Sequence, residues 1–360
     1  MKLSLIALFL LLSAYLIIFR VELFCFFFDN KLGCYGSNLE LRRGLFGIEK
    51  TKAKLIELYD KGRLSQGQCH SLSHEVGRAA ARADKTIIES AMKDENSFCG
   101  WGYYHGVMEG LFGDRANHGT LAEDAVRICR NISGNFIDVF NCFHALGHGF
   151  YFADKDLIKA FEGCLNAGDN DVEDGYCVDG VFMANSFFAE PENKYFKKDD
   201  PIFPCDIVDD VHKPYCYWRS LPLNIFGQSE DLPDYDYISS IGNKVPEEFR
   251  LVFWNGIGRE LDSRTASDMS KISELCGRTG GTYGFSCLIG AGRHMIFYDK
   301  GKTERAEELC SYLIPYEVAS PRSSGLAPLA RARLRTGLND EAIKADCVNL
   351  MRVQSYPGIN

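Results

Sequence analysis

A short stretch rich in cysteine, histidine and glycine recurs along the chain. Its clearest copy has the sequence CFHALGHG, from Cys142 to Gly149. Seven related copies begin at Cys69, Cys99, Cys142, Cys177, Cys216, Trp254 and Cys287. Neighbouring copies begin 30 to 43 residues apart, a period typical of helical-hairpin arrays. Because each hairpin buries its apolar face only against its neighbours, the period predicts one continuous helical core.

Amphipathic segments alternate with these copies and predict outer helices with one solvated face. They are Ala53–Lys61, Thr86–Lys93, Leu121–Arg130, Asp156–Leu165, Ser267–Cys276 and Thr303–Leu313. The inner segments are rich in glycine, as at Gly102, Gly106 and Gly110. Glycine destabilises a helix by about 1 kcal/mol relative to alanine, so close approach of helix backbones is the simplest compensation. We therefore expect an all-α fold of about seven helical hairpins, closed as an α/α toroid or wound as a tightly curved solenoid.

The helical-repeat domain is expected over residues 51–360. Proline-containing intervals at 189–215 and 227–247 interrupt the period and predict long loops. Helical patterns at Gly325–Arg335 and Asp340–Arg352 predict a terminal cap.

The first 28 residues predict a membrane anchor. The run Leu3–Phe19 is almost wholly apolar, and after Arg20 and Glu22 a second apolar run follows. The first run is at the short limit for a spanning helix and longer than the usual core of a signal peptide. No small-x-small cleavage site follows, which favours an uncleaved transmembrane signal anchor at 1–28 over a cleaved peptide. Residues 29–50 would form a juxtamembrane connector.

Fourteen cysteines indicate an oxidising compartment. The main domain of this single-pass membrane protein is therefore expected in the periplasm, a lumen or the extracellular space. Four hairpins have two cysteines 11 or 13 residues apart, predicting the disulfides Cys129–Cys142, Cys164–Cys177, Cys205–Cys216 and Cys276–Cys287. Free thiols or metal ligands are the alternative. The remaining cysteines are less defined: Cys69 and Cys99 pair or stay free, Cys310 with Cys347 would form a clamp, and Cys25 and Cys34 are unassigned.

Five of the eight histidines lie on three consecutive inner segments. Two pairs have i,i+4 spacing, which places both members on one helix face. Imidazole and carboxylate ligands suit zinc, iron, copper or manganese. The candidate metal ligands are His70, His74, His105, Glu109, His144 and His148. The alternative is that the histidines are structural. Non-covalent haem stays open, whereas the lack of CxxCH argues against covalent haem.

Six copies have a polar or sulfur-containing residue five or six residues after their first residue. These residues are His74, His105, His148, Met183, Arg259 and Arg293. If the inner helices ring a common axis, these side chains point toward one another. Four polar residues of the last copies are candidates for binding an anionic ligand, with an internal ion-pair network as the alternative. They are Arg259, Glu260, Arg293 and His294.

The composition and the motifs leave two hypotheses for the function. The net charge of −9, without a basic stripe, argues against nucleic-acid binding. No P-loop, nucleophile elbow or dinucleotide fingerprint is present, so catalysis is left open. The first hypothesis is a metal-dependent enzyme or metal handler. The second is a non-catalytic scaffold that binds a protein or peptide on the repeat surface, with structural histidines.

Two families have similar architecture. The cysteine-stapled hairpins over residues 50–350 resemble Sel1-like repeat proteins, which implies an extracytoplasmic binding scaffold without catalysis. The glycine- and histidine-rich inner helices resemble the α/α toroid of lanthionine synthetase cyclases, which hold one zinc ion with two cysteines and a histidine. Cys69-His70 matches part of that family's Cys-His-Gly signature, with Ser71 in place of its glycine.

Overall fold

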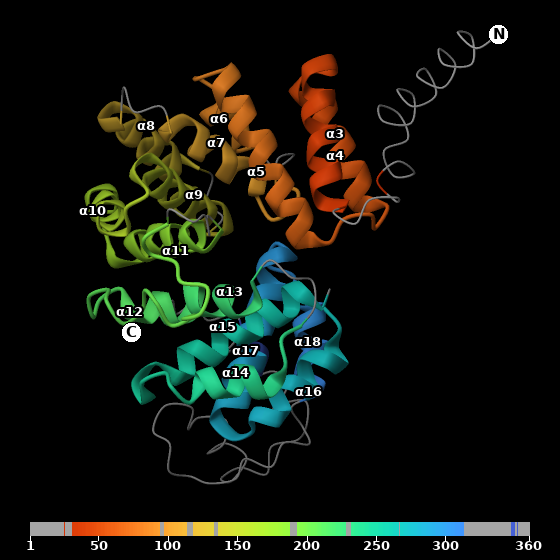
Figure 1. Ribbon diagram of the computed structural model, residues 1–360, viewed down its shortest axis with the longest axis vertical. Helices are drawn as coiled ribbons and strands as arrows, with labels where there is room; N and C mark the ends of the chain where they lie inside the picture. The colour runs from red at the N-terminus through yellow and green to blue at the C-terminus, as the bar shows by residue number, and fades with distance from the viewer. Residues whose placement is uncertain are drawn as a thin grey trace, which may run out of the picture. The chain divides into compact units, whose positions relative to one another are not determined.

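The computed structural model describes most of the chain between residues 31 and 312. The described residues are Cys25, 31–93, 97–113, 118–132, 136–187, 193–227, 232–265, 267–312, 347–349 and 351. Every regular element in these ranges is helical (Figure 1), which confirms the predicted all-α class. The predicted anchor, apart from Cys25, and nearly all of the predicted terminal cap lie outside them. The chain divides into two compact units, residues 1–121 and 122–360.

The first unit contains five helices among its described residues before α8 begins. They are α3 (Lys31–Phe46), α4 (Ile48–Asp60), α5 (Gln66–Ala83), α6 (Ile88–Ala91) and α7 (Gly102–Phe112). The predicted connector at 29–50 is therefore helical from Lys31. Helix α5 begins with a capping box, since Ser65 accepts the Gln68 amide proton and its own amide donates back to the Gln68 side chain.

The second unit begins within α8 and alternates long apolar helices with shorter amphipathic ones. Its elements are α8 (His118–Asn131), α9 (Phe136–Asp154), α10 (Leu157–Ala167), α11 (Asp171–Phe187), α12 (Lys213–Tyr215), the π-helix η2 (Cys216–Ser220), α13 (Leu221–Phe226), α14 (Tyr235–Gly242), the 3₁₀-helix η3 (Glu247–Phe249), α15 (Arg250–Arg264), α16 (Met269–Thr279), α17 (Gly281–Tyr298) and α18 (Glu304–Ser311). Its apolar core includes the fully buried side chains of Tyr151, Phe182 and Phe253.

Helices occur at the segments that the sequence predicted as outer helices. Each of the six predicted outer segments contains or overlaps a helix, namely α4, α6, α8, α10, α16 and α18. The prediction of a loop at 227–247 is wrong in part, because helix α14 lies within this interval. Pro233 stands just before that helix rather than within it, and Asp234 caps it by accepting the amide proton of Asp236 at 2.8 Å. The helical-hairpin repeat and its closure into a toroid or solenoid stay predictions.

Seven disulfides account for all fourteen cysteines. The four predicted pairs are confirmed. The other three are Cys25–Cys34, Cys69–Cys99 and Cys310–Cys347. Such a set indicates an oxidising, extracytoplasmic environment. Among the described residues, no helix has both the length and the apolar composition needed to cross a membrane.

Helices α5 and α7 cross with their backbones in contact. A β-carbon at Gly106 would overlap the carbonyl of His74. One at Gly77 would overlap the carbonyl of Tyr103 and lie 2.8 Å from the amide nitrogen of Val107. Because no real side chain tolerates such distances, these positions require glycine for space, as the glycine spacing predicted.

The same reciprocal contact recurs twice in the second unit. Helices α9 and α11 cross at Gly147 and Gly180, and α15 and α17 cross at Gly258 and Gly290. In all three crossings, each glycine faces the carbonyl group of the residue three positions before the partner glycine. The contact therefore fixes the same register between the two helices each time.

The crossing predicts opposite effects for two glycines of one helix. Gly77→Ala should lower the free energy of unfolding by about 1–3 kcal/mol, because the added methyl group forces the helices apart. Gly67, in the first turn of α5, has no neighbouring atom within 4 Å of the place that a β-carbon would take. Gly67→Ala should be neutral or stabilise the protein by up to about 1 kcal/mol. Denaturant unfolding measures both, and equal effects would contradict the close-packed crossing.

Candidate metal-binding site

Three of the predicted ligands come together in the first unit. His70 and His74 lie one turn apart on α5, and His105 lies on α7 beside the glycine of the crossing. The three rings are buried, and their centroids are 4.7, 5.3 and 5.4 Å apart. One nitrogen of each ring lies within 4.8 Å of the others. The arrangement has the donor type and the spacing of a metal site, as the sequence predicted.

Glu109 orients His74. Nδ1 of His74 lies 2.8 Å from one oxygen of Glu109, and the second oxygen accepts a hydrogen bond from Arg78. Glu109 is fully buried, and its ion pair with Arg78 favours the carboxylate form. Since a carboxylate only accepts, Nδ1 of His74 carries the proton. Both oxygens of Glu109 are thus engaged in orienting neighbours, an arrangement usual behind metal-binding histidines.

His70 is held in the same tautomer by the backbone. Its Nδ1 lies 2.8 Å from the carbonyl oxygen of Cys99, which also only accepts. In the neutral forms, Nε2 of both His70 and His74 carries a lone pair. These two Nε2 atoms are 3.0 Å apart. Two lone pairs facing each other at this distance repel unless a proton or a cation lies between them.

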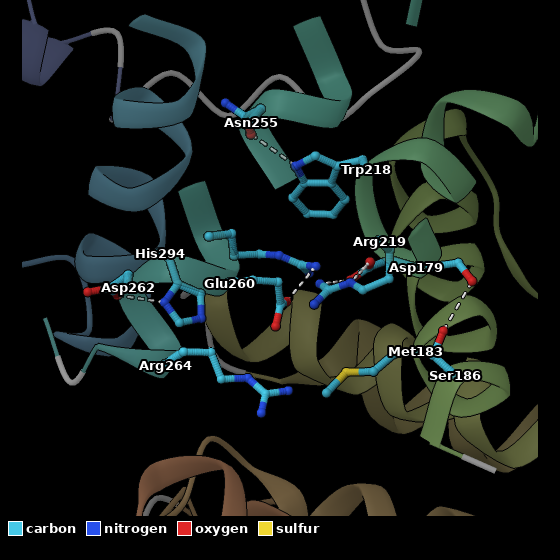
Figure 2. Close-up of polar contacts among 12 residues, drawn as sticks. Asp179, Met183, Ser186, Trp218, Arg219, Asn255, Glu260, Asp262, Arg264 and His294 are labelled. Carbon is cyan, nitrogen blue, oxygen red and sulfur yellow. Dashed lines mark hydrogen bonds and ion pairs between the residues drawn. The ribbon is translucent and has the colours of Figure 1, made fainter. Parts of the chain in front are cut away.

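The second histidine pair has a parallel set of partners in the second unit. Nδ1 of His144 lies 2.9 Å from Asp179 on α11. Arg219 donates two hydrogen bonds to the same carboxylate (Figure 2). Nε2 of His144 lies 3.2 Å from Nε2 of His148. The predicted union of these two histidines with those of the first unit in one centre stays a prediction.

Met183 completes this second cluster. Its Sδ atom lies 3.2 Å from Nε2 of His144. Met183 was not among the predicted ligands, although the alignment of the copies placed it with histidines. The residues next to Met183 in the sequence do not distinguish it from a core methionine. Its contact is with His144 on α9, which lies 39 residues away in the sequence.

The glycine crossings correct the alignment of the copies. His74 and His144 each stand three residues before the crossing glycine of their helix, and Asn255 has that place in α15. His148 and Arg259, in contrast, each follow that glycine by one residue. The sequence alignment paired His74 with His148 because they lie at similar distances from the opening cysteine. Relative to the crossing glycines, their positions differ by one helical turn. Distance from the opening cysteine does not align the copies, because the cysteine lies at different distances from the crossing glycine. Cys69 lies eight residues before Gly77, whereas Cys142 lies five before Gly147.

Two opposing effects act on Asp179. Its complete burial disfavours the carboxylate, but the charge of Arg219 and the hydrogen bonds from Arg219 and His144 outweigh burial and hold its pKa below the ordinary value. Asp179 is therefore ionised at neutral pH and holds the proton of His144 on Nδ1.

Three of the four predicted anion-binding residues form ion pairs with one another or with a neighbour. Arg259 forms an ion pair with Glu260 at 2.9 Å. His294 forms one with Asp262 at 2.6 Å (Figure 2). Burial raises the pKa of Glu260 despite nearby arginines. The Arg259 guanidinium also stacks on Trp218, 4.7 Å from the ring centroid. These contacts agree with the ion-pair alternative, and the anionic ligand stays a prediction.

No known protein family matches the chain, and no curated protein or solved structure is similar to it. The resemblances to Sel1-like repeats and to lanthionine synthetase cyclases stay predictions.

The Asp179–Arg219 pair predicts a pH-dependent stability. In the metal-free protein, Asp179→Asn should lower the free energy of unfolding at pH 7 by about 3–5 kcal/mol, because Arg219 is left buried without its carboxylate. A carboxyl group with a lowered folded pKa stabilises the fold above its unfolded pKa of about 3.9 and loses this contribution as the pH falls. The difference from wild type should thus shrink below about pH 4.

Asp210 supplies the control for this measurement. Its carboxylate pairs with Lys213 at 2.6 Å, but it is 91% exposed. Asp210→Asn should change stability little at either pH, because water screens the pair. Denaturant unfolding at several pH values tests both variants. The role given to Asp179 predicts that wild type and Asp179→Asn become more similar in free energy of unfolding at low pH. A difference in this free energy that stays constant down to about pH 3, below the unfolded pKa, would contradict that role.

Proposed function

We propose that this protein binds a transition-metal ion through His70, His74 and His105. The single observation that carries the proposal is the pair of Nε2 atoms of His70 and His74, 3.0 Å apart. Both Nδ1 protons are committed to acceptors, so both lone pairs point to one place. A cation there relieves the repulsion and uses both histidines as ligands.

The donor set favours a borderline ion such as zinc. Neutral imidazole suits zinc, copper, iron and nickel, and a catalytic zinc site has three protein ligands with a fourth position for water. The carboxylate behind His74 increases the basicity of its Nε2 atom. With an open fourth position, the ion would make hydrolysis by metal-bound water the reaction class to test first. Metal handling without catalysis uses the same three ligands.

We propose further that the protein is held at a membrane by residues 1–28, with its helical units on the oxidising side. The apolar run Leu3–Phe19 supports the anchor. The disulfide Cys25–Cys34 supports the orientation, because Cys25 follows that run and its bond forms in an oxidising compartment. The scaffold hypothesis has no observation of its own in its favour.

Zinc binding predicts a stabilisation that depends on His105. Zinc at one hundred times its dissociation constant should raise the free energy of unfolding of the purified protein by about 2.7 kcal/mol. His105→Ala should lose this increment, and elemental analysis should find one zinc ion fewer per chain. Loss of the ligand removes the reason for zinc to prefer the folded state.

His212 offers a matched control. It is also buried, stacks on Phe161 with ring centroids 4.0 Å apart, and bonds to Asp209. His212→Ala should be less stable than wild type but keep the full increment from zinc. The proposal is wrong if His105→Ala keeps the same increment and the same zinc content as the wild type.

A further inference from the structure

Three donor atoms converge in the second unit. Nε2 of His144 lies 3.2 Å from Nε2 of His148 and 3.2 Å from Sδ of Met183. The Nδ1 proton of His144 is donated to Asp179, so its Nε2 lone pair faces the other two atoms. A thioether sulfur has no proton to offer. We infer that His144, His148 and Met183 bind a copper(I) ion.

The fold presents these donors from two helices. Both histidines come from α9 at i,i+4 spacing, and α11 supplies Asp179 and Met183 at the same spacing. The crossing at Gly147 and Gly180 brings the two backbones into contact at this level. One helix thus provides the nitrogen ligands, and the other provides both the sulfur and the carboxylate that orients the first nitrogen.

The donor distances suit a small ion. With the lengths of zinc–imidazole and zinc–thiolate bonds as a guide, about 2.0 Å to both nitrogens and about 2.3 Å to the sulfur, an ion would make an N–ion–N angle of about 106° and an N–ion–S angle of about 96°. Both angles are close to those of a tetrahedral centre. Each of these two donor–donor distances is therefore short enough for one ion to bind both atoms.

The sulfur selects the metal. Thioether and thiolate ligands favour copper(I), whereas carboxylates and carbonyls favour magnesium, calcium or manganese. All fourteen cysteines of this chain are in disulfides, so no thiolate competes with Met183 for a soft cation. Asp179 is held as a carboxylate by Arg219, and it raises the basicity of His144.

This site is independent of the zinc site proposed for the first unit. It shares no residue with His70, His74 and His105, and its sulfur distinguishes the two by metal preference. Failure of the zinc proposal therefore leaves the copper proposal standing, and the reverse also holds.

The test compares Met183→Leu with Met295→Leu in the full chain. Both methionines are buried, and the replacement keeps the side-chain volume nearly constant. Copper(I) is titrated anaerobically against bicinchoninate, with ascorbate as a reductant that spares disulfides. Met183→Leu should bind copper(I) at least about ten-fold more weakly than wild type, as expected when a ligand is lost. Met295→Leu should match the wild type, and all three proteins should bind zinc equally.

X-ray absorption at the copper edge provides the second measurement. Wild type and Met295→Leu should show a sulfur scatterer bonded to copper, and Met183→Leu should show nitrogen or oxygen scatterers only. Equal copper(I) affinity in wild type and Met183→Leu, or wild-type copper without a sulfur neighbour, would overturn the inference. In that case Nε2 of His148 carries a proton and donates a hydrogen bond to Nε2 of His144.

Discussion

The structure depends on direct contact between helix backbones at paired glycines. In each of three crossings, a glycine on either helix faces a carbonyl group of the other. A side chain at these positions would push the helices apart, and the histidines of the first two crossings would no longer meet their partners across the interface. The glycines lower the helix propensity of both segments, and the packing gained at the crossing compensates for that loss.

At the first two crossings, the close approach places a histidine against a buried carboxylate. His74 meets Glu109, and His144 meets Asp179. An arginine holds each carboxylate in its charged form, and each histidine directs its Nε2 atom toward a second histidine. The third crossing has Asn255 at the corresponding place, where it accepts a hydrogen bond from Trp218. The same backbone contact thus supports both a metal-type cluster and an ordinary polar contact.

Much of this could be predicted from residues close together in the sequence. The i,i+4 histidine pairs and the disulfides that close short loops depend on local spacing, so the sequence located them. The partners of the histidines could not be found in this way, because Glu109, Asp179 and Met183 lie 35 or 39 residues from the rings they touch. Their contacts depend on the register of the crossings, which cysteine spacing does not determine. Helix α14 was not predicted because Pro233 indicates a loop. The next residue, Asp234, is in fact the N-cap of the helix.

The central claim is that protein acceptors fix the tautomers of these histidines before any metal binds. Long-range proton–nitrogen correlation spectra of metal-free protein with ¹⁵N-labelled histidine measure this directly. At neutral pH, His70, His74 and His144 should each show a protonated Nδ1, and the Nε2 atoms of His70 and His74 should share at most one proton. Addition of metal should then shift the Nε2 resonances. Protonated Nε2 atoms in these three residues, with no change on adding zinc or copper(I), would contradict the account.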